Sequence, residues 1–381
     1  MTEPTAPRYF AASNSCRGFC NYYGDLFAFS ERFAFSERSA FSERSADSRV
    51  DRLYIIKGGP GTGKSHFMKV VARRARAVGY RVTEYACSSD PASLDGLLLN
   101  REGSPTLGFL DGTAPHVREP NLPGVKEEMI NLGQFWNSRL LVGQGDTIRT
   151  LTAGKSAAYG RAYAYLAACG EVDRAVESLM EACVCGSRLE ALADRILRHQ
   201  SRGETFSAVP ALRRAVGMTG QVCLHTFERE TAENGGTLLI AEDYYGLGYR
   251  LTAALMARSR QLGHRLWVSY DPVYPQKIDG LYYPDGNLCV LVGHAEPPEG
   301  CALRTLSLRR YADPTLLKDI RGELRHGYAQ RDRLLASALR ELASAATFHF
   351  DLESIYSAAM DFGRKEAYTE EFCASLFGAG E

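Results

Sequence analysis

The stretch of sequence that most constrains this 381-residue chain covers residues 53–65 and reads LYIIKGGPGTGKS. Its first four residues form an apolar run typical of a buried strand, and residues 58–65 match the pattern G-x-x-x-x-G-K-[ST]. The next segment has an apolar stripe and a basic side and stops at Gly79, which predicts an amphipathic helix. Strand, glycine-rich loop and helix in this order predict an α/β domain built around a phosphate-binding loop.

The residue types of this loop suit a nucleotide triphosphate. Glycines allow successive backbone N–H groups to point inward as an anion nest, and the N-terminus of the following helix adds partial positive charge. We expect Lys64 to reach the β- and γ-phosphates and the Ser65 hydroxyl to bind Mg²⁺. The predicted nucleotide-binding residues are Gly58, Gly59, Pro60, Gly61, Thr62, Gly63, Lys64, Ser65 and His66.

A second apolar strand, residues 106–110, ends at Asp111 in the sequence TLGFLDGTAPH. A strand that ends in Asp is the Walker B arrangement, which places a carboxylate opposite Ser65 where it can hold Mg²⁺. We therefore predict Lys64 and Asp111 as catalytic residues, and Ser65 and Asp111 as metal-binding residues. The alternative is that Asp111 only forms a turn before Gly112.

The residue after Asp111 restricts the chemistry. Many vigorous ATPases place a Glu there to activate water, whereas this chain has Gly112. Hydrolysis would need another carboxylate, such as Asp90, Asp95 or Glu119, or the phosphoryl group would pass to an acceptor other than water.

The second half of the chain repeats the first. Residues 237–241 (TLLIA) take the place of residues 53–57, and residues 288–293 (LCVLVG) match 107–112. Residues 246–250 (GLGYR) fall on 61–65. We predict two tandem P-loop NTPase-type domains, each a mainly parallel sheet flanked by helices with a helical appendage.

The repeat also shows what the second half has lost. In this alignment Tyr249, Arg250 and Val292 stand where the first half has the phosphate cation, the magnesium hydroxyl and the Walker B carboxylate. We therefore expect a degenerate second domain that binds no Mg-nucleotide in the standard way.

Two Asp pairs recur as well. The Asp90-Pro and Asp95-Gly dipeptides are echoed by Asp271-Pro and Asp279-Gly. Because these residues persist in the degenerate half, we interpret both as turn residues with a structural role.

Composition shifts divide the chain. Three tandem hexapeptides, FAFSER, FAFSER and SAFSER, occupy residues 27–44, and their period fits neither a helix nor a half-buried strand, which indicates a surface insertion. Residues 147–199 read as two or three helices that form a hairpin on the core. The predicted parts are a P-loop domain with Walker A and B (1–146, with a low-complexity insertion at 27–49), a helical appendage (147–205), a degenerate P-loop-like domain (206–310) and a C-terminal helical appendage (311–381).

The totals exclude some partners. Lys+Arg and Asp+Glu both number 45, so net charge points to neither nucleic acid nor an anionic membrane. The chain starts without a signal-peptide core and has no run long enough to span a membrane, so we expect a cytoplasmic protein. Its 10 cysteines lack zinc-finger spacing and are expected to be small buried side chains.

Several motifs resemble a bacterial family of duplicated P-loop proteins described as ATPases or as nucleotide-kinase-like. The resemblance rests on RYFAASNSCRGF near the start, IIKGGPGTGKS, CSSDPASLDG, LDGTAPH, NLGQFWN and their second-half echoes, and it covers nearly the whole chain. It implies ATP binding and gives no substrate. The chain departs from that family at Tyr249 and Arg250 and adds the hexapeptides.

The leading hypothesis is an ATP- and Mg²⁺-dependent P-loop NTPase with one competent site, supported by contact between the two halves. ATP is preferred over GTP because no N-K-x-D element follows the Walker B strand. One alternative is a small-molecule or nucleotide kinase. Another is a nucleotide-gated switch that acts on an unknown partner with little turnover.

Overall fold

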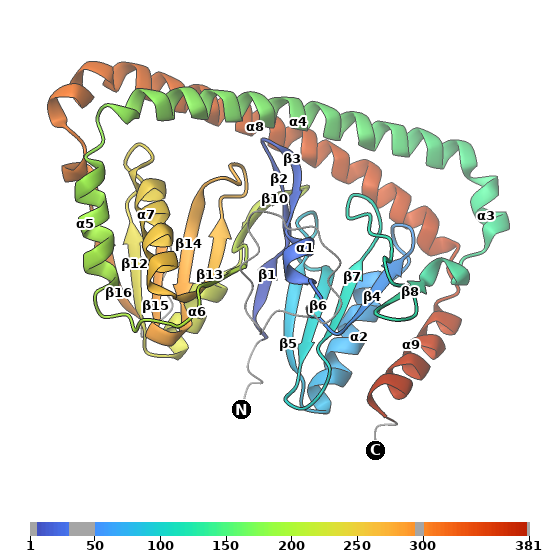
Figure 1. The fold of residues 1–381 in the computed structure, drawn as a ribbon. Helices are drawn as coiled ribbons and strands as arrows, with labels where there is room; N and C mark the ends of the chain where they lie inside the picture. The colour runs from blue at the N-terminus through green and yellow to red at the C-terminus, as the bar shows by residue number, and fades with distance from the viewer. Residues whose placement is uncertain (1–5, 30–49, 294–300, 379–381) are drawn as a thin grey trace.

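The computed structural model describes residues 6–29, 50–293 and 301–378 and contains two six-stranded sheets (Figure 1). The first sheet contains β1 (Arg8–Phe10), β4 (Arg52–Lys57), β5 (Arg81–Ala86), β6 (Leu94–Asn100), β7 (Leu107–Asp111) and β8 (Glu127–Asn131), in the order β1-β5-β6-β7-β4-β8. Among these strands only β6 is antiparallel to its neighbours. The predicted α/β class, with a mainly parallel sheet, is confirmed.

The second sheet has the same topology. It contains β9 (Ser207–Pro210), β12 (Thr237–Ala241), β13 (Arg265–Tyr270), β14 (Ile278–Tyr283), β15 (Leu288–Val292) and β16 (Ala302–Leu306), in the order β9-β13-β14-β15-β12-β16. Its antiparallel strand is β14, the counterpart of β6. Helix α2 (Lys64–Ala77) follows β4, and helix α7 (Leu247–Leu262) follows β12. The structure therefore contains the two tandem α/β units that the sequence repeat predicts.

The repeat extends further than the sequence indicated. The hairpin β2 (Ala12–Ser15) and β3 (Gly18–Asn21), followed by α1 (Tyr23–Leu26), is matched by β10 (Arg214–Gly217), β11 (Gly220–Cys223) and α6 (Thr226–Glu233). The two hairpins contact each other, because Asn14 Nδ2 donates to the Val216 carbonyl at 2.7 Å and the Val216 N–H donates to Ser13 Oγ at 2.9 Å. The two halves of the chain are thus in direct contact.

The helical segments pack differently from the prediction. After η3 (Leu132–Phe135) and α3 (Ser138–Gly143), one continuous helix, α4 (Gly145–Glu181), runs from the first domain to the second (Figure 1). Helix α8 (Pro314–Ala358), which follows η5 (Arg309–Tyr311), runs back beside it. Small residues such as Ala158 and Ala162 line the buried stripe of α4, and Phe348 of α8 lies against Gly154. The expected hairpin on the core is therefore wrong, because this stripe pairs α4 with α8 instead.

The two short terminal helices are consequently exchanged between the domains. Helix α5 (Gly186–Leu197), which follows the first domain in sequence, packs on α7 of the second domain. Helix α9 (Phe362–Phe377), at the end of the chain, packs on α2 of the first domain. Each appendage completes the other domain. Among the described helices, none has both the length and the apolar character of a membrane span.

The first hexapeptide is only partly a surface insertion. Phe27 is fully buried, with its ring over Gly96 and Gly108, where an added Cβ would lie 2.9 Å from ring atoms. Ala28 and Val50 are buried as well, and the Val50 N–H donates to the Ala28 carbonyl at 2.9 Å. The expectation of a wholly exposed repeat is wrong for Phe27, because these two glycines leave room for its ring. Residues 30–49 lie outside the described residues.

We predict that Phe27→Ala destabilises the protein by about 3 to 4 kcal/mol, because it empties a fully buried aromatic position between two glycines that cannot fill the space. Chemical denaturation measures the loss. Phe350→Ala is the matched control, since the Phe350 side chain is 52% exposed and its removal should change stability by less than about 1 kcal/mol. Equal losses of stability from both variants would show that the Phe27 ring is not buried.

Candidate functional site

The glycine loop, residues 58–63, adopts a conformation that requires glycine at two positions. Gly61 and Gly63 have φ angles of 68° and 81°, and Gly63 is the N-cap of α2. At Gly58 a Cβ would lie 2.5 Å from Thr62 Oγ1. Thr62 is fully buried and donates its hydroxyl to the Gly59 carbonyl at 2.9 Å. The loop is thus folded on itself at the N-terminus of a long helix, as an anion nest requires.

Lys64 and Asp111 come together at this loop. Because β7 is the direct neighbour of β4 and Ile56 pairs with Asp111, the strand end places the carboxylate beside the loop. Asp111 Oδ2 lies 3.6 Å from Lys64 Nζ, and both side chains are largely buried. Lys64 also donates to the Gly59 carbonyl at 2.9 Å, while Asp111 Oδ1 accepts from the Thr113 N–H at 2.9 Å. The two predicted catalytic residues are therefore adjacent.

Ser65 and His66, which were also predicted, lie in the first turn of α2, and their side chains point in different directions. Ser65 Oγ accepts a hydrogen bond from the Leu94 N–H at 3.0 Å, which leaves the hydroxyl group with a further lone pair. His66 is exposed and faces α9, with Nδ1 3.1 Å from Lys365 Nζ and 3.3 Å from Glu366 Oε1. Pro60 lies in the turn between Gly59 and Gly61.

Close packing explains why position 112 is a glycine. A Cβ at this position would lie 2.4 Å from Ile55 Cγ2, so a Glu cannot follow Asp111 without displacement of the sheet interior. The adjoining loop is held by Lys57, whose Nζ donates to the Gly112 carbonyl at 2.9 Å and pairs with Glu119 Oε1 at 2.6 Å. The missing Glu is thus a consequence of how closely this loop packs on β4.

The alternative carboxylates are engaged in the structure. Asp90 accepts from the Ala92 N–H at 3.1 Å and from Ser93 Oγ at 2.6 Å, which closes the turn after β5. Asp95 is buried, and its Oδ2 lies 3.3 Å from both His116 Nε2 and the Tyr23 hydroxyl. Burial raises the pKa of Asp95. These contacts support a structural role for both residues, but the turn interpretation is wrong for Asp95, which lies within β6 because Gly96 pairs with Tyr85 and Leu110 on both sides.

The second domain has an apolar contact where the first has its ion pair. Ile56 pairs with Asp111 and Ala241 with Val292, so the predicted equivalence of Asp111 and Val292 is confirmed. A Cβ on Gly248 would lie 2.6 Å from Val292 Cγ1, which shows that the helix start packs directly on this strand end.

The helix register corrects part of the sequence alignment. The buried residues of α2 include Phe67, Val71 and Ala75, and those of α7 include Leu251, Leu255 and Ser259, which match at an offset of 184, one less than the offset of 185 between β4 and β12. Gly248 therefore stands in the place of Lys64 and Tyr249 in that of Ser65, not Tyr249 and Arg250 as aligned. Before α7 the left-handed residues are Tyr245 and Gly246, with φ angles of 51° and 83°.

The loop after β13 requires a second correction. The Asp271 N–H donates to the Lys277 carbonyl at 2.9 Å, just as the Cys87 N–H donates to the Ser93 carbonyl at 3.1 Å. Asp271 therefore corresponds to Cys87 and not to Asp90, because the two loops have equal length. Asp279 does correspond to Asp95, since both are the second residue of the antiparallel strand.

The site includes residues that sequence reasoning missed. The end of α8 and the start of α9 lie on the glycine loop: Ser357 Oγ donates to the Gly61 carbonyl at 3.1 Å, and the Tyr356 ring lies 3.0 Å from where a Gly59 Cβ would be. Lys365, almost fully buried, lies beside Gly63 and donates to Glu366 at 2.8 Å. Nothing local in the sequence indicates these contacts, which join residues 296 positions apart.

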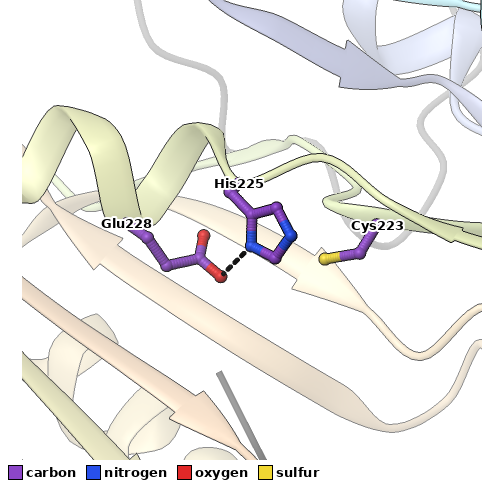
Figure 2. A group of neighbouring side chains, drawn as sticks. All are labelled: Cys223, His225 and Glu228. Carbon is purple, nitrogen blue, oxygen red and sulfur yellow. Dashed lines mark hydrogen bonds and ion pairs between the residues drawn. The ribbon is translucent and has the colours of Figure 1, made fainter. Parts of the chain in front are cut away.

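Among the described residues, Cys223, His225 and Glu228 form a separate cluster whose potential metal-ligating atoms lie within 4.8 Å of one another (Figure 2). His225 Nδ1 lies 3.3 Å from Glu228 Oε1. However, buried Arg213 donates to the same Oε1 at 3.0 Å, and its Nη1 lies 3.7 Å from Cys223 Sγ. Burial also raises the pKa of Cys223. Because a fixed guanidinium already supplies the positive charge there, we assign this cluster no metal.

Comparison with protein-family models, curated proteins and solved structures returned no significant match. The family resemblance therefore stays a prediction.

Proposed function

We propose that this protein is an ATP- and Mg²⁺-dependent P-loop NTPase with one competent nucleotide site, in the first domain. The observation that supports this most is the Lys64–Asp111 pair beside the left-handed glycines Gly61 and Gly63. In the second domain the equivalent positions are Gly248 and Val292, in apolar contact. The charge pair beside the glycine loop of the first domain therefore has no counterpart at Gly248 and Val292.

The residues fit the proposed cofactor. Mg²⁺ binds hard oxygen ligands, and the Ser65 hydroxyl and the Asp111 carboxylate are at the first turn of α2 and at the end of the adjacent strand. When bound, Mg²⁺ would neutralise charge on the β- and γ-phosphates. Lys64, released from the Gly58 and Gly59 carbonyls, would donate to the phosphate oxygens that take their place.

Phosphoryl transfer to a small molecule or nucleotide is the second candidate function. Gly112 favours it, since packing against Ile55 excludes a water-activating Glu after Asp111. A screen of the purified protein for phosphate release, with and without candidate acceptors, decides between hydrolysis and transfer.

We predict that Asp111→Asn lowers Mg²⁺-dependent turnover by about 100-fold while ATP affinity changes only a few-fold. The amide keeps an oxygen for the Thr113 N–H but loses the charge that a divalent cation requires. Turnover and ATP binding are measured over a Mg²⁺ titration. Asp146→Asn is the control, because Asp146 is exposed and pairs with Arg149. Full Mg²⁺-dependent activity in Asp111→Asn would leave Asp111 as a turn residue.

A further inference from the structure

The helix that crosses from the first domain to the second carries a half-buried lysine, Lys155, near a contact with the first domain. Lys155 lies on α4, and the next turn of the same face carries Tyr159. The Tyr159 hydroxyl lies 3.4 Å from Ser89 Oγ, in the loop that follows β5. That loop lies at the carboxyl-terminal edge of the parallel strands, where the glycine loop also lies. Lys155 is therefore one helical turn from a contact with this edge of the sheet.

Lys155 is half-buried and has no hydrogen bond or ion pair within the described part of the chain. Burial lowers the pKa of Lys155. The charge of Glu353 raises this pKa, and the charge of Lys64 lowers it. Glu353 itself lies at the glycine loop, with its carbonyl oxygen 2.5 Å from where a Gly61 Cβ would be. Lys155 and Lys64 thus lie near the same loop. Their positive charges repel each other, and an anion bound between them would remove this repulsion.

The internal repeat provides a comparison. Arg331 on α8 is the counterpart of Lys155. The starts of α5 and α9 are 176 positions apart, and so are Lys155 and Arg331. In the degenerate half this cation is neutralised, because Arg331 Nη1 lies 3.7 Å from Asp173 Oδ1. The counterpart of Asp173 is His349, which instead pairs with Glu353 at 3.6 Å. The competent half therefore lacks the carboxylate that neutralises the equivalent cation.

We propose that Lys155 is a second phosphate-binding cation, which contacts the terminal phosphate of ATP from the crossing helix while Lys64 contacts it from the glycine loop. This rests on the proposed function. Because α4 continues to the second domain, the residue that senses the terminal phosphate is on the element that connects the two halves.

The test is calorimetric titration of the full-length protein with Mg-ATP and with Mg-ADP. Lys155→Met, which keeps the apolar stem, should weaken Mg-ATP binding about 10-fold or more, as expected for loss of a charge-assisted contact. Mg-ADP binding should change less than about 3-fold. Arg161→Met is the matched control, because Arg161 lies on the same helix and pairs with Glu341 at 2.9 Å; both affinities should stay at the wild-type value.

The outcomes separate the two proposals. If wild-type protein binds neither nucleotide, the proposed function fails and the inference falls with it. If wild type binds Mg-ATP and Lys155→Met binds it equally, only the role of Lys155 is overturned. Equal weakening of Mg-ATP and Mg-ADP would overturn the contact with the terminal phosphate. Melting curves of each variant establish that the protein is folded.

Discussion

Lys64→Ala is expected to weaken ATP binding by about 100-fold or more while the protein stays folded. In the structure Lys64 donates to two loop carbonyls and pairs with Asp111, so its loss removes no apolar core. With nucleotide bound, the same ammonium would make charge-assisted hydrogen bonds to phosphate, which are among the strongest polar contacts in proteins. Isothermal titration with Mg-ATP measures the difference.

Lys69→Ala is the matched control for this experiment. Lys69 lies on the same helix, is exposed, and among the residues that the structure describes donates only to the Ala92 carbonyl at 2.7 Å. Its removal should leave ATP affinity within about 2-fold. If Lys64→Ala is folded and binds ATP as wild type does, the assignment of residues 58–65 as a phosphate-binding loop is wrong.

Local patterns were sufficient to predict the framework of the site. The apolar run before Gly58 and the strand that ends at Asp111 form neighbouring strands, which explains why two residues far apart in sequence lie 3.6 Å apart at Lys64 Nζ and Asp111 Oδ2. The alignment of the two halves is correct for β7 and β15, but residues 237–241 correspond to 52–56 and not to 53–57, because Thr237 pairs with Leu288 as Arg52 pairs with Leu107. The alignment is wrong in the loop before α7. One residue is missing there, which shifts the helix by one position although the glycines still match the spacing of the first half.

Long-range packing could not be predicted in this way. An apolar stripe shows that a helix is buried on one face, but it does not name the partner, so α4 was assigned to a local hairpin. Tyr356 and Ser357 reach the glycine loop only because α8 returns from the second domain. Phe27 was assigned to the surface because its hexapeptide is repeated, whereas its burial depends on Gly96 and Gly108, which belong to other strands.

The exchange of terminal helices makes a prediction about which domain each helix stabilises. Phe372 of α9 lies against the rings of Tyr54 and Phe67, at centroid distances of 5.3 and 5.4 Å. Leu192 of α5 is buried in the cluster that contains Leu251 of α7. If each appendage completes the other domain, a cavity in the last helix of the chain weakens the first domain.

We expect Phe372→Ala to cost about 3 kcal/mol and to expose the amides of β4 and α2 to hydrogen exchange. Leu192→Ala should instead expose those of β12 and α7, at a cost of about 2 to 3 kcal/mol. Because a two-domain chain need not unfold in one step, local exchange is more informative than a single melting temperature. If Phe372→Ala instead removed protection from amides of the second domain, the assignment of α9 to the first domain would be wrong. Since α9 also lies beside Gly63 through Lys365, Phe372→Ala should weaken ATP binding, whereas Leu192→Ala should not.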